Sequence, residues 1–210
     1  MFLKHTRTPC ILFFLTFFLI PLGPEQSRGD LYNSVVKNQK TEVNNNAISR
    51  LKAYDSYIDY FASLPYVSPQ RTVHPHFIRA LILAESEGKS DAVSEKDAIG
   101  LGQIRYPTGR QAAKELSTSA MHFRYVNKFK LASLTRADLF DPAVNILLTC
   151  YLVSRYNNQF DGRLDLVVSA WNAGENTQSL AENKHAPYKE TESLIGKING
   201  YYLFLLKHHL

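Results

Sequence analysis

The chain has 210 residues, of which 45% are hydrophobic and 20% are charged, so it can bury the core of about one globular domain. With only 10 glycines and 9 prolines, it is neither collagenous nor largely disordered. Its formal net charge of +5 falls to +3 without Lys4 and Arg7, too little for a nucleic-acid-binding surface. The two cysteines, Cys10 and Cys150, are too few for a disulfide framework.

Residues 1–23 have the pattern of a secretory signal peptide. Lys4 and Arg7 form a basic start, and a mostly apolar run over residues 10–22 follows. These 13 residues are fewer than the roughly 20 that a membrane-spanning helix needs. We therefore expect export to the periplasm. Because Leu22-Gly23-Pro24 is a poor cleavage site, an uncleaved segment that anchors the chain remains an alternative.

Residues 24–46 are polar, lack periodicity and end in three asparagines, which predicts a linker or disordered arm. Residues 47–210 then form the remaining domain. Spacings of three and four between apolar residues, together with capping residues, predict helices over 47–65, 75–88, 107–116, 143–159, 164–173 and 190–207. Pro75 and the pair Asp141-Pro142 are typical of helix starts, and Gly174 of a helix end. No segment alternates with period two, so the predicted fold class is all-α.

Two glutamates end the predicted helix over residues 75–88, and their faces differ. Glu85 follows Leu81 by four positions and Ile82 by three, so it projects from the apolar stripe, whereas Glu87 lies on the polar side. Burial disfavours a carboxylate and raises its pKa, which produces a general acid that works near neutral pH. The face argument leaves two interpretations of Glu85 open: a catalytic acid, or a helix-end acid in a salt bridge.

Two further segments contain residues suited to a ligand-binding groove. Glycines flank Leu101 just before Gln103, which predicts a tight backbone turn. Trp171 and Asn172 end another predicted helix, and they would offer an aromatic face and an amide to a sugar. Taken singly, each segment also has an ordinary explanation, as a connecting loop or as a core tryptophan beside a capping asparagine.

Taken together and in this order, six segments resemble the soluble lytic transglycosylase (SLT) domain of the lysozyme-like superfamily. They are Glu85-Ser86, Ala92-Val93-Ser94, Gly100-Leu101-Gly102-Gln103, Asp141-Pro142, Ala170-Trp171-Asn172-Ala173-Gly174 and Pro187-Tyr188-Lys189-Glu190-Thr191. The resemblance implies a lysozyme-like helical domain with a substrate groove, in which Glu85 is the catalytic acid/base. It further implies peptidoglycan glycan strands as substrate, and substrate-binding roles for Ser86, Ser94, Gln103, Trp171, Asn172 and Tyr188. The sequence itself indicates no cofactor and no metal, because its histidine pairs lack a third ligand at recognisable spacing. Ser94 would lie beside Glu85 as a hydrogen-bonding partner.

Three departures from the family pattern stand out. Gly102 replaces a methionine, which would remove a side chain from the groove wall, and Trp171 replaces a tyrosine. Leu194 replaces the tyrosine expected to hydrogen-bond the catalytic glutamate. Tyr188 or Tyr201 would be alternative hydroxyl donors. The missing tyrosine leaves an inactive peptidoglycan-binding protein as one hypothesis.

The resemblance and the single well-placed acid favour a lytic transglycosylase. Such an enzyme cleaves the β-1,4 bond between MurNAc and GlcNAc and leaves a 1,6-anhydroMurNAc end. The rival enzyme is a hydrolase like goose-type lysozyme, which needs a second carboxylate. Asp91, Glu95 and Asp97 are its candidate bases, although solvated loop residues are the simpler interpretation. By analogy with small wall-opening enzymes, a secretion or conjugation machine is a candidate partner; nucleic acid is not.

Overall fold

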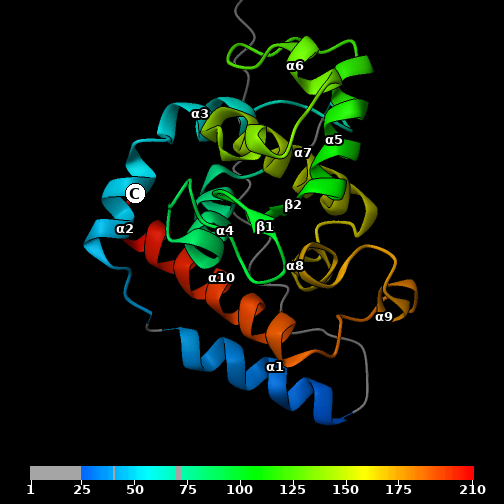
Figure 1. Ribbon diagram of the computed structural model, residues 1–210. Coiled ribbons are helices and arrows are strands. Elements are labelled where there is room, and N and C mark those ends of the chain that lie inside the picture. Colours follow the sequence, from blue (N-terminus) through cyan, green and yellow to red (C-terminus); the bar gives the residue numbers. More distant parts are fainter. Residues whose placement is uncertain (1–24, 40, 70–71) are drawn as a thin grey trace, which may run out of the picture.

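The computed structural model describes residues 25–39, 41–69 and 72–210, and the expected signal peptide lies outside them (Figure 1). The described part is helical apart from one small hairpin, which confirms the all-α fold class. Its helices are α1 (Glu25–Asn38), α2 (Asn45–Lys52), α3 (Asp55–Ala62), α4 (Pro75–Ser86), α5 (Tyr106–Thr118), α6 (Lys128–Ala132), the 3-10 helix η3 (Ala137–Phe140), α7 (Pro142–Gln159), α8 (Leu164–Ala173), α9 (Gln178–Ala181) and α10 (Lys189–His208). None of these described helices is long and apolar enough to cross a membrane.

Helices α4 and α7 form the centre of the core, and both begin where the sequence predicts. Pro75 occupies the first turn of α4, and the backbone N–H of His76 donates to Nδ1 of His74 at 3.2 Å. Asp141 caps α7 by accepting from the backbone N–H of Ala143 at 3.0 Å. These caps satisfy backbone groups that a helix start leaves without an intrahelical partner. They allow two largely buried helices to begin inside the domain.

The helix predicted over residues 47–65 is two helices, α2 and α3. The chain leaves helical geometry at Tyr54, where φ is −109° and ψ is 5°. After this break, the carboxylates of Asp55 and Asp59 both reach Arg79 on α4, at 2.6 and 2.9 Å. The Arg79 side chain is buried, so its charge requires these partners. Apolar spacing alone does not show this break, because Leu51, Tyr54 and Ile58 keep helical spacing across it.

The expectation that residues 24–46 form a linker or disordered arm is wrong for residues 25–38, which form α1. This helix lies along α10 (Figure 1). The Ser34 hydroxyl donates to the backbone oxygen of Glu192 at 2.8 Å. A Cβ atom on Gly196 would come within 2.2 Å of Ser34 Oγ, so glycine is required for this close approach. The packing of α1 on α10 depends on close backbone approach and on few apolar side chains. This explains why residues 25–38 show little apolar periodicity.

The only sheet within the described ranges is an antiparallel hairpin of β1 (Ala98–Ile99) and β2 (Ile104–Arg105). Ala98 pairs with Arg105, and Ile99 with Ile104. Two-residue strands are too short for an alternating pattern to be visible in the sequence. The hairpin presents residues 100–103 as a tight turn between α4 and α7, which is the predicted glycine-containing turn.

Candidate active site

Glu85 lies in the last turn of α4, where α4 meets α8 and α10. Its side chain is partly buried, and Nε1 of Trp171 on α8 donates to its Oε1 atom at 2.9 Å. From α10, Nζ of Lys197 donates to the backbone oxygen of Ala84 at 3.5 Å. The carboxyl group thus has a neutral donor and a nearby cation on two different helices.

Burial raises the pKa of Glu85 to about 7. The Trp171 hydrogen bond and the Lys197 charge oppose this rise, and the charge of Glu190 adds to it. Near neutral pH, protonated and ionised Glu85 therefore coexist, as a group that both donates and accepts a proton requires. Glu87 is exposed instead and pairs with Arg50 at 3.7 Å and Lys89 at 3.3 Å. The predicted difference between the two glutamates is confirmed.

The turn over residues 100–103 is held from α7 by one buried side chain, Asn145. Its Oδ1 accepts from the backbone N–H of Gly102 at 2.8 Å, and its Nδ2 donates to the oxygens of Ile99 at 2.9 Å and Leu139 at 2.8 Å. From α4, the buried Ser86 hydroxyl donates to the Leu101 oxygen at 2.8 Å. Ser86, expected to bind substrate, thus fixes the turn to the helix that contains Glu85.

The proposed effect of Gly102 on the groove wall is wrong. A Cβ atom at this position would come within 2.3 Å of Thr149 Oγ1 on α7. A side chain here would therefore point into the helix packing and not into a groove. The glycine allows the turn to approach α7 closely, which is a structural role.

Gln103 and Ser94 stabilise the loop that precedes the hairpin. Nε2 of Gln103 donates to the oxygens of Gly100 at 2.9 Å and Ala92 at 3.3 Å. Ser94 is exposed, and its hydroxyl accepts from the backbone N–H of Ala98 at 3.0 Å. The structure therefore pairs Ser94 with its own turn, whereas the expected partner was Glu85.

Asn172 and Glu190 form the other side of the site. The Thr191 hydroxyl donates to Oδ1 of Asn172 at 2.6 Å, and a side-chain hydrogen bond joins Asn172 to Glu190. Nζ of Lys96, in the loop before β1, donates to Oε2 of Glu190 at 2.7 Å and holds its pKa below the usual value. Tyr188 begins this segment and is 54% exposed. The pair Lys96–Glu190 thus links the loop before β1 to the start of α10.

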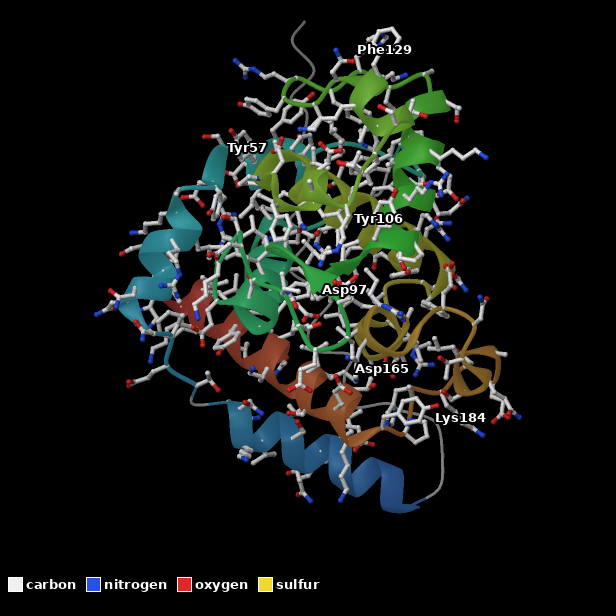
Figure 2. All side chains as sticks on the ribbon, in the orientation of Figure 1. Tyr57, Asp97, Tyr106, Phe129, Asp165 and Lys184 are labelled. Carbon is white, nitrogen blue, oxygen red and sulfur yellow. The ribbon has the colours of Figure 1, made fainter. Side chains whose placement is uncertain are left out.

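The candidate bases of a hydrolase lie in the exposed loop before β1. Figure 2 shows Asp97 there, and its carboxylate accepts from the Arg136 guanidinium, which lowers the pKa of Asp97. Asp91 and Glu95 are exposed. These surroundings are those of solvated surface acids.

The sequence profile described as "Transglycosylase SLT domain" matches residues 66–193. The chain belongs to this family. Among solved structures, the domain is similar to an inactive mutant of lytic transglycosylase Slt from Pseudomonas aeruginosa, at 22% identity and a TM-score of 0.55. That match covers 75% of this chain and 24% of the other. A second is the 70 kDa soluble lytic transglycosylase from Escherichia coli, at 17% identity and a TM-score of 0.56, covering 86% of this chain and 30% of that enzyme.

These likenesses establish the lysozyme-like helical fold of the SLT domain. The chain spans less than a third of the length of either solved enzyme. A comparison with curated proteins found no match.

The side-chain hydrogen bond to Glu85 comes from Trp171. Leu194, at the tyrosine's position, is buried on α10. Tyr188 is exposed, and the charge of Glu87 adds to the burial that raises the pKa of Tyr201. Sequence reasoning missed Lys197. It lies three positions after Leu194, one helical turn along the same face, and this spacing was the available signal.

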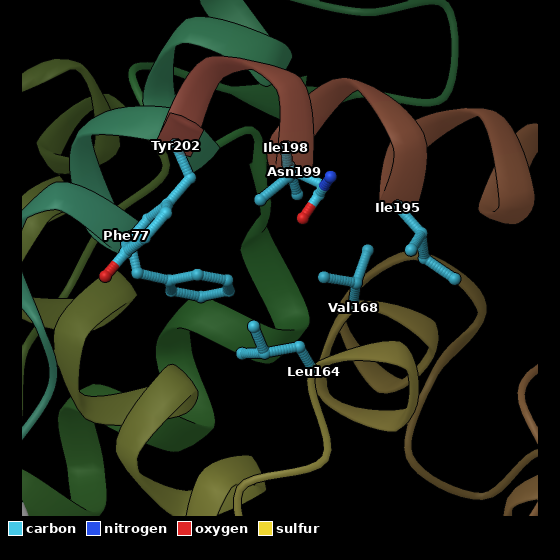
Figure 3. A pocket seen from close by; sticks show the side chains of 7 residues that line it. All are labelled: Phe77, Leu164, Val168, Ile195, Ile198, Asn199 and Tyr202. Atoms are coloured by element: carbon cyan, nitrogen blue, oxygen red, sulfur yellow. The ribbon is translucent and has the colours of Figure 1, made fainter. Parts of the chain in front are cut away.

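A separate apolar cavity lies between α4, α8 and α10 (Figure 3). Its lining residues are Phe77, Leu164, Val168, Ile195, Ile198, Asn199 and Tyr202, and Glu85 is not among them. Ligand sites combine apolar walls with convergent polar groups, and this lining is almost entirely apolar. We interpret the cavity as a gap in helix packing. In the described residues, no group of three His, Cys, Asp or Glu side chains is placed to hold a metal ion.

Proposed function

We propose that this SLT domain is a peptidoglycan lytic transglycosylase. It cleaves the β-1,4 bond between MurNAc and GlcNAc and forms 1,6-anhydroMurNAc, with Glu85 as the single acid/base. The supporting observation is the Glu85 carboxyl group, whose pKa near 7 lets it work as an acid and then as a base. The family membership supports the substrate class.

The reaction needs one carboxyl group because the substrate contains its own nucleophile. Protonated Glu85 gives its proton to the glycosidic oxygen as the bond from that oxygen to C1 of MurNAc breaks. The 6-hydroxyl of the same MurNAc then bonds to C1 and releases its proton to the Glu85 carboxylate. Glu85 is protonated again, GlcNAc leaves with a free hydroxyl, and no water is consumed.

The surroundings of the other acids favour this route over hydrolysis. A hydrolase needs a second carboxylate that activates water or attacks C1. Asp97 is engaged by Arg136, and Asp91 and Glu95 are exposed in the same loop. Glu190, whose charge acts on Glu85, is bound by Lys96.

The proposal includes export, since peptidoglycan lies outside the cytoplasm. The basic start and apolar run of residues 1–23 support delivery to the periplasm. Local wall opening for a secretion or conjugation machine is the accompanying hypothesis, which rests on family analogy alone. Cell fractionation tests the first point, and co-purification with the machine's components tests the second.

Digestion of purified peptidoglycan by matched variants tests the catalytic role of Glu85. We expect Glu85→Gln to lower the release of soluble fragments by about a thousandfold or more, since it removes the only acid/base. Glu87→Gln changes a neighbouring exposed glutamate and should retain wild-type release. Circular dichroism verifies folding of both variants. Equal losses in the two would contradict the assignment, and a folded wild type that binds peptidoglycan without cutting it would indicate a binding protein.

A further inference from the structure

Trp171 is the only tryptophan in the chain, and its indole N–H is directed at the group that we propose as the acid/base. Nε1 lies 2.9 Å from Oε1 of Glu85, a good hydrogen-bond distance. An indole N–H donates and cannot accept, and it carries no proton that titrates in this pH range. Trp171 can therefore hold Oε1 in both protonation states of Glu85, with the proton of the neutral form on Oε2.

The backbone around Trp171 is fixed on both sides. Before it, the buried Ser169 hydroxyl donates to the oxygen of Asp165 at 2.7 Å and accepts from the N–H of Ala186 at 3.0 Å. After it, Asn172 is bound by Thr191 at 2.6 Å. These hydrogen bonds connect the end of α8 to residues 186–191, and they fix the backbone position from which the Trp171 side chain extends.

We propose that Trp171 is the positioning residue of Glu85 and takes over the hydrogen bond that the family assigns to a tyrosine at the position of Leu194. The inference rests on the proposed function, because it names the group that orients the acid/base. With Oε1 held by the indole, Oε2 is the oxygen that exchanges its proton with the substrate. The role differs from sugar stacking, which the sequence suggested for this residue.

The charged groups that act on Glu85 are Lys197 and Glu190, both on α10, and Glu190 is in turn paired with Lys96. Lys197 lowers the pKa of Glu85, and Glu190 raises it. Trp171 adds direction, since a hydrogen bond depends on angle as well as distance. Loss of the indole N–H should therefore change both the geometry and the pKa of Glu85.

The fluorescence of Trp171 reports on the contact without requiring turnover. In a pH titration of the wild-type chain, we expect a transition with a midpoint near 7 as Glu85 ionises beside the indole. Glu85→Gln should abolish it, and the matched control Glu87→Gln should retain it. A transition that persists in Glu85→Gln, or none in the wild type, would overturn the proposal.

Removal of the donor provides the second test. Trp171→Phe keeps an aromatic ring and removes the N–H, so the pKa of Glu85 should rise by about one unit. Carbon-13 NMR of labelled glutamate carboxyl groups measures this shift, with Glu85→Gln identifying the signal. An unchanged Glu85 pKa in folded Trp171→Phe would contradict the role.

Kinetics on soluble glycan strands separates positioning from stacking. We expect kcat of Trp171→Phe to fall about tenfold with little change in KM, whereas loss of a stacking surface would mainly raise KM. If the wild type shows no turnover while the NMR shift is present, the proposed function fails and the contact stands. If turnover is normal and the shift is absent, the positioning role fails alone.

Discussion

Asn145 and Glu85 are both polar side chains placed among apolar helices, but their environments differ. The Asn145 side chain is fully buried, and it makes three hydrogen bonds at 2.8–2.9 Å to the backbone of Gly102, Ile99 and Leu139. Glu85 receives one hydrogen bond from a neutral donor at 2.9 Å, and burial raises its pKa to about 7. The first group is satisfied, and the second is held in an environment that disfavours its charge.

The difference distinguishes scaffold from reactive group in this domain. A buried amide with its hydrogen bonds made contributes stability and defines one backbone arrangement. A buried carboxyl group with a raised pKa costs stability when it ionises and is suited to proton transfer. The same domain therefore contains Asn145, which stabilises the fold, and Glu85, which destabilises the fold when it ionises. The two residues lie about 60 positions apart in the sequence. Substitutions of these two residues should therefore change the free energy of unfolding in opposite directions.

The largest expected change in stability comes from Asn145→Ala. It leaves the Gly102 N–H and the oxygens of Ile99 and Leu139 buried without their partner, so the free energy of unfolding should fall by about 3 kcal/mol or more. Urea denaturation measures this, with Asn176→Ala at an exposed position as the control. A fall of less than about 1 kcal/mol in the free energy of unfolding would show that the turn does not depend on Asn145.

Glu85→Gln should have the opposite effect on stability, and only at higher pH. The folded pKa of about 7 exceeds the ordinary value of 4.5, so the wild type loses stability as pH rises between these values. Glutamine stays neutral, and the variant should therefore be more stable than the wild type by about 3 kcal/mol at pH 8 and nearly equal to it at pH 4. Urea denaturation at both pH values tests this. The same difference at both would mean that the ionisation of Glu85 costs nothing.

The smallest change is expected from the charges around Glu85. Lys197→Met removes a cation that lowers the pKa of Glu85, so that pKa should rise by about half a unit. Glu190→Gln removes an anion that raises it, so the pKa should fall. Since Glu85 acts first in its protonated form, the high-pH limb of kcat/KM should move up in the first variant and down in the second. Shifts of the same sign would contradict the assigned electrostatics.

Much of the fold was predictable because its signals are local. The starts at Pro75 and Asp141 and the end at Gly174 depend on residues within one helical turn, and the structure confirms them. Helix α1 was missed because its contact with α10 depends on Gly196, which lies more than 160 positions after Ser34. The break at Tyr54 was missed because the helical spacing of the apolar residues continues across it.

The candidate site divides in the same way. Glu85 was identified from its face on one helix, and its raised pKa follows from that burial. The hydrogen bond from Trp171 to Glu85 was not predicted, because 86 positions separate the two residues. The sequence also offered a separate role for each of them. Ser94 and Gly102 were assigned to the groove by resemblance, and the structure pairs them with Ala98 and Thr149 instead. Local patterns predicted the acid, and tertiary contacts determined its partner.

Mass spectrometry of the digestion products is the most direct test of the central claim, that Glu85 works alone and the substrate supplies the nucleophile. Fragments of purified peptidoglycan should end in 1,6-anhydroMurNAc. They should be lighter by one water than the corresponding lysozyme fragments, and borohydride should not reduce their ends because the anomeric carbon is locked. Reducible MurNAc ends would show that a water was activated and would contradict the account.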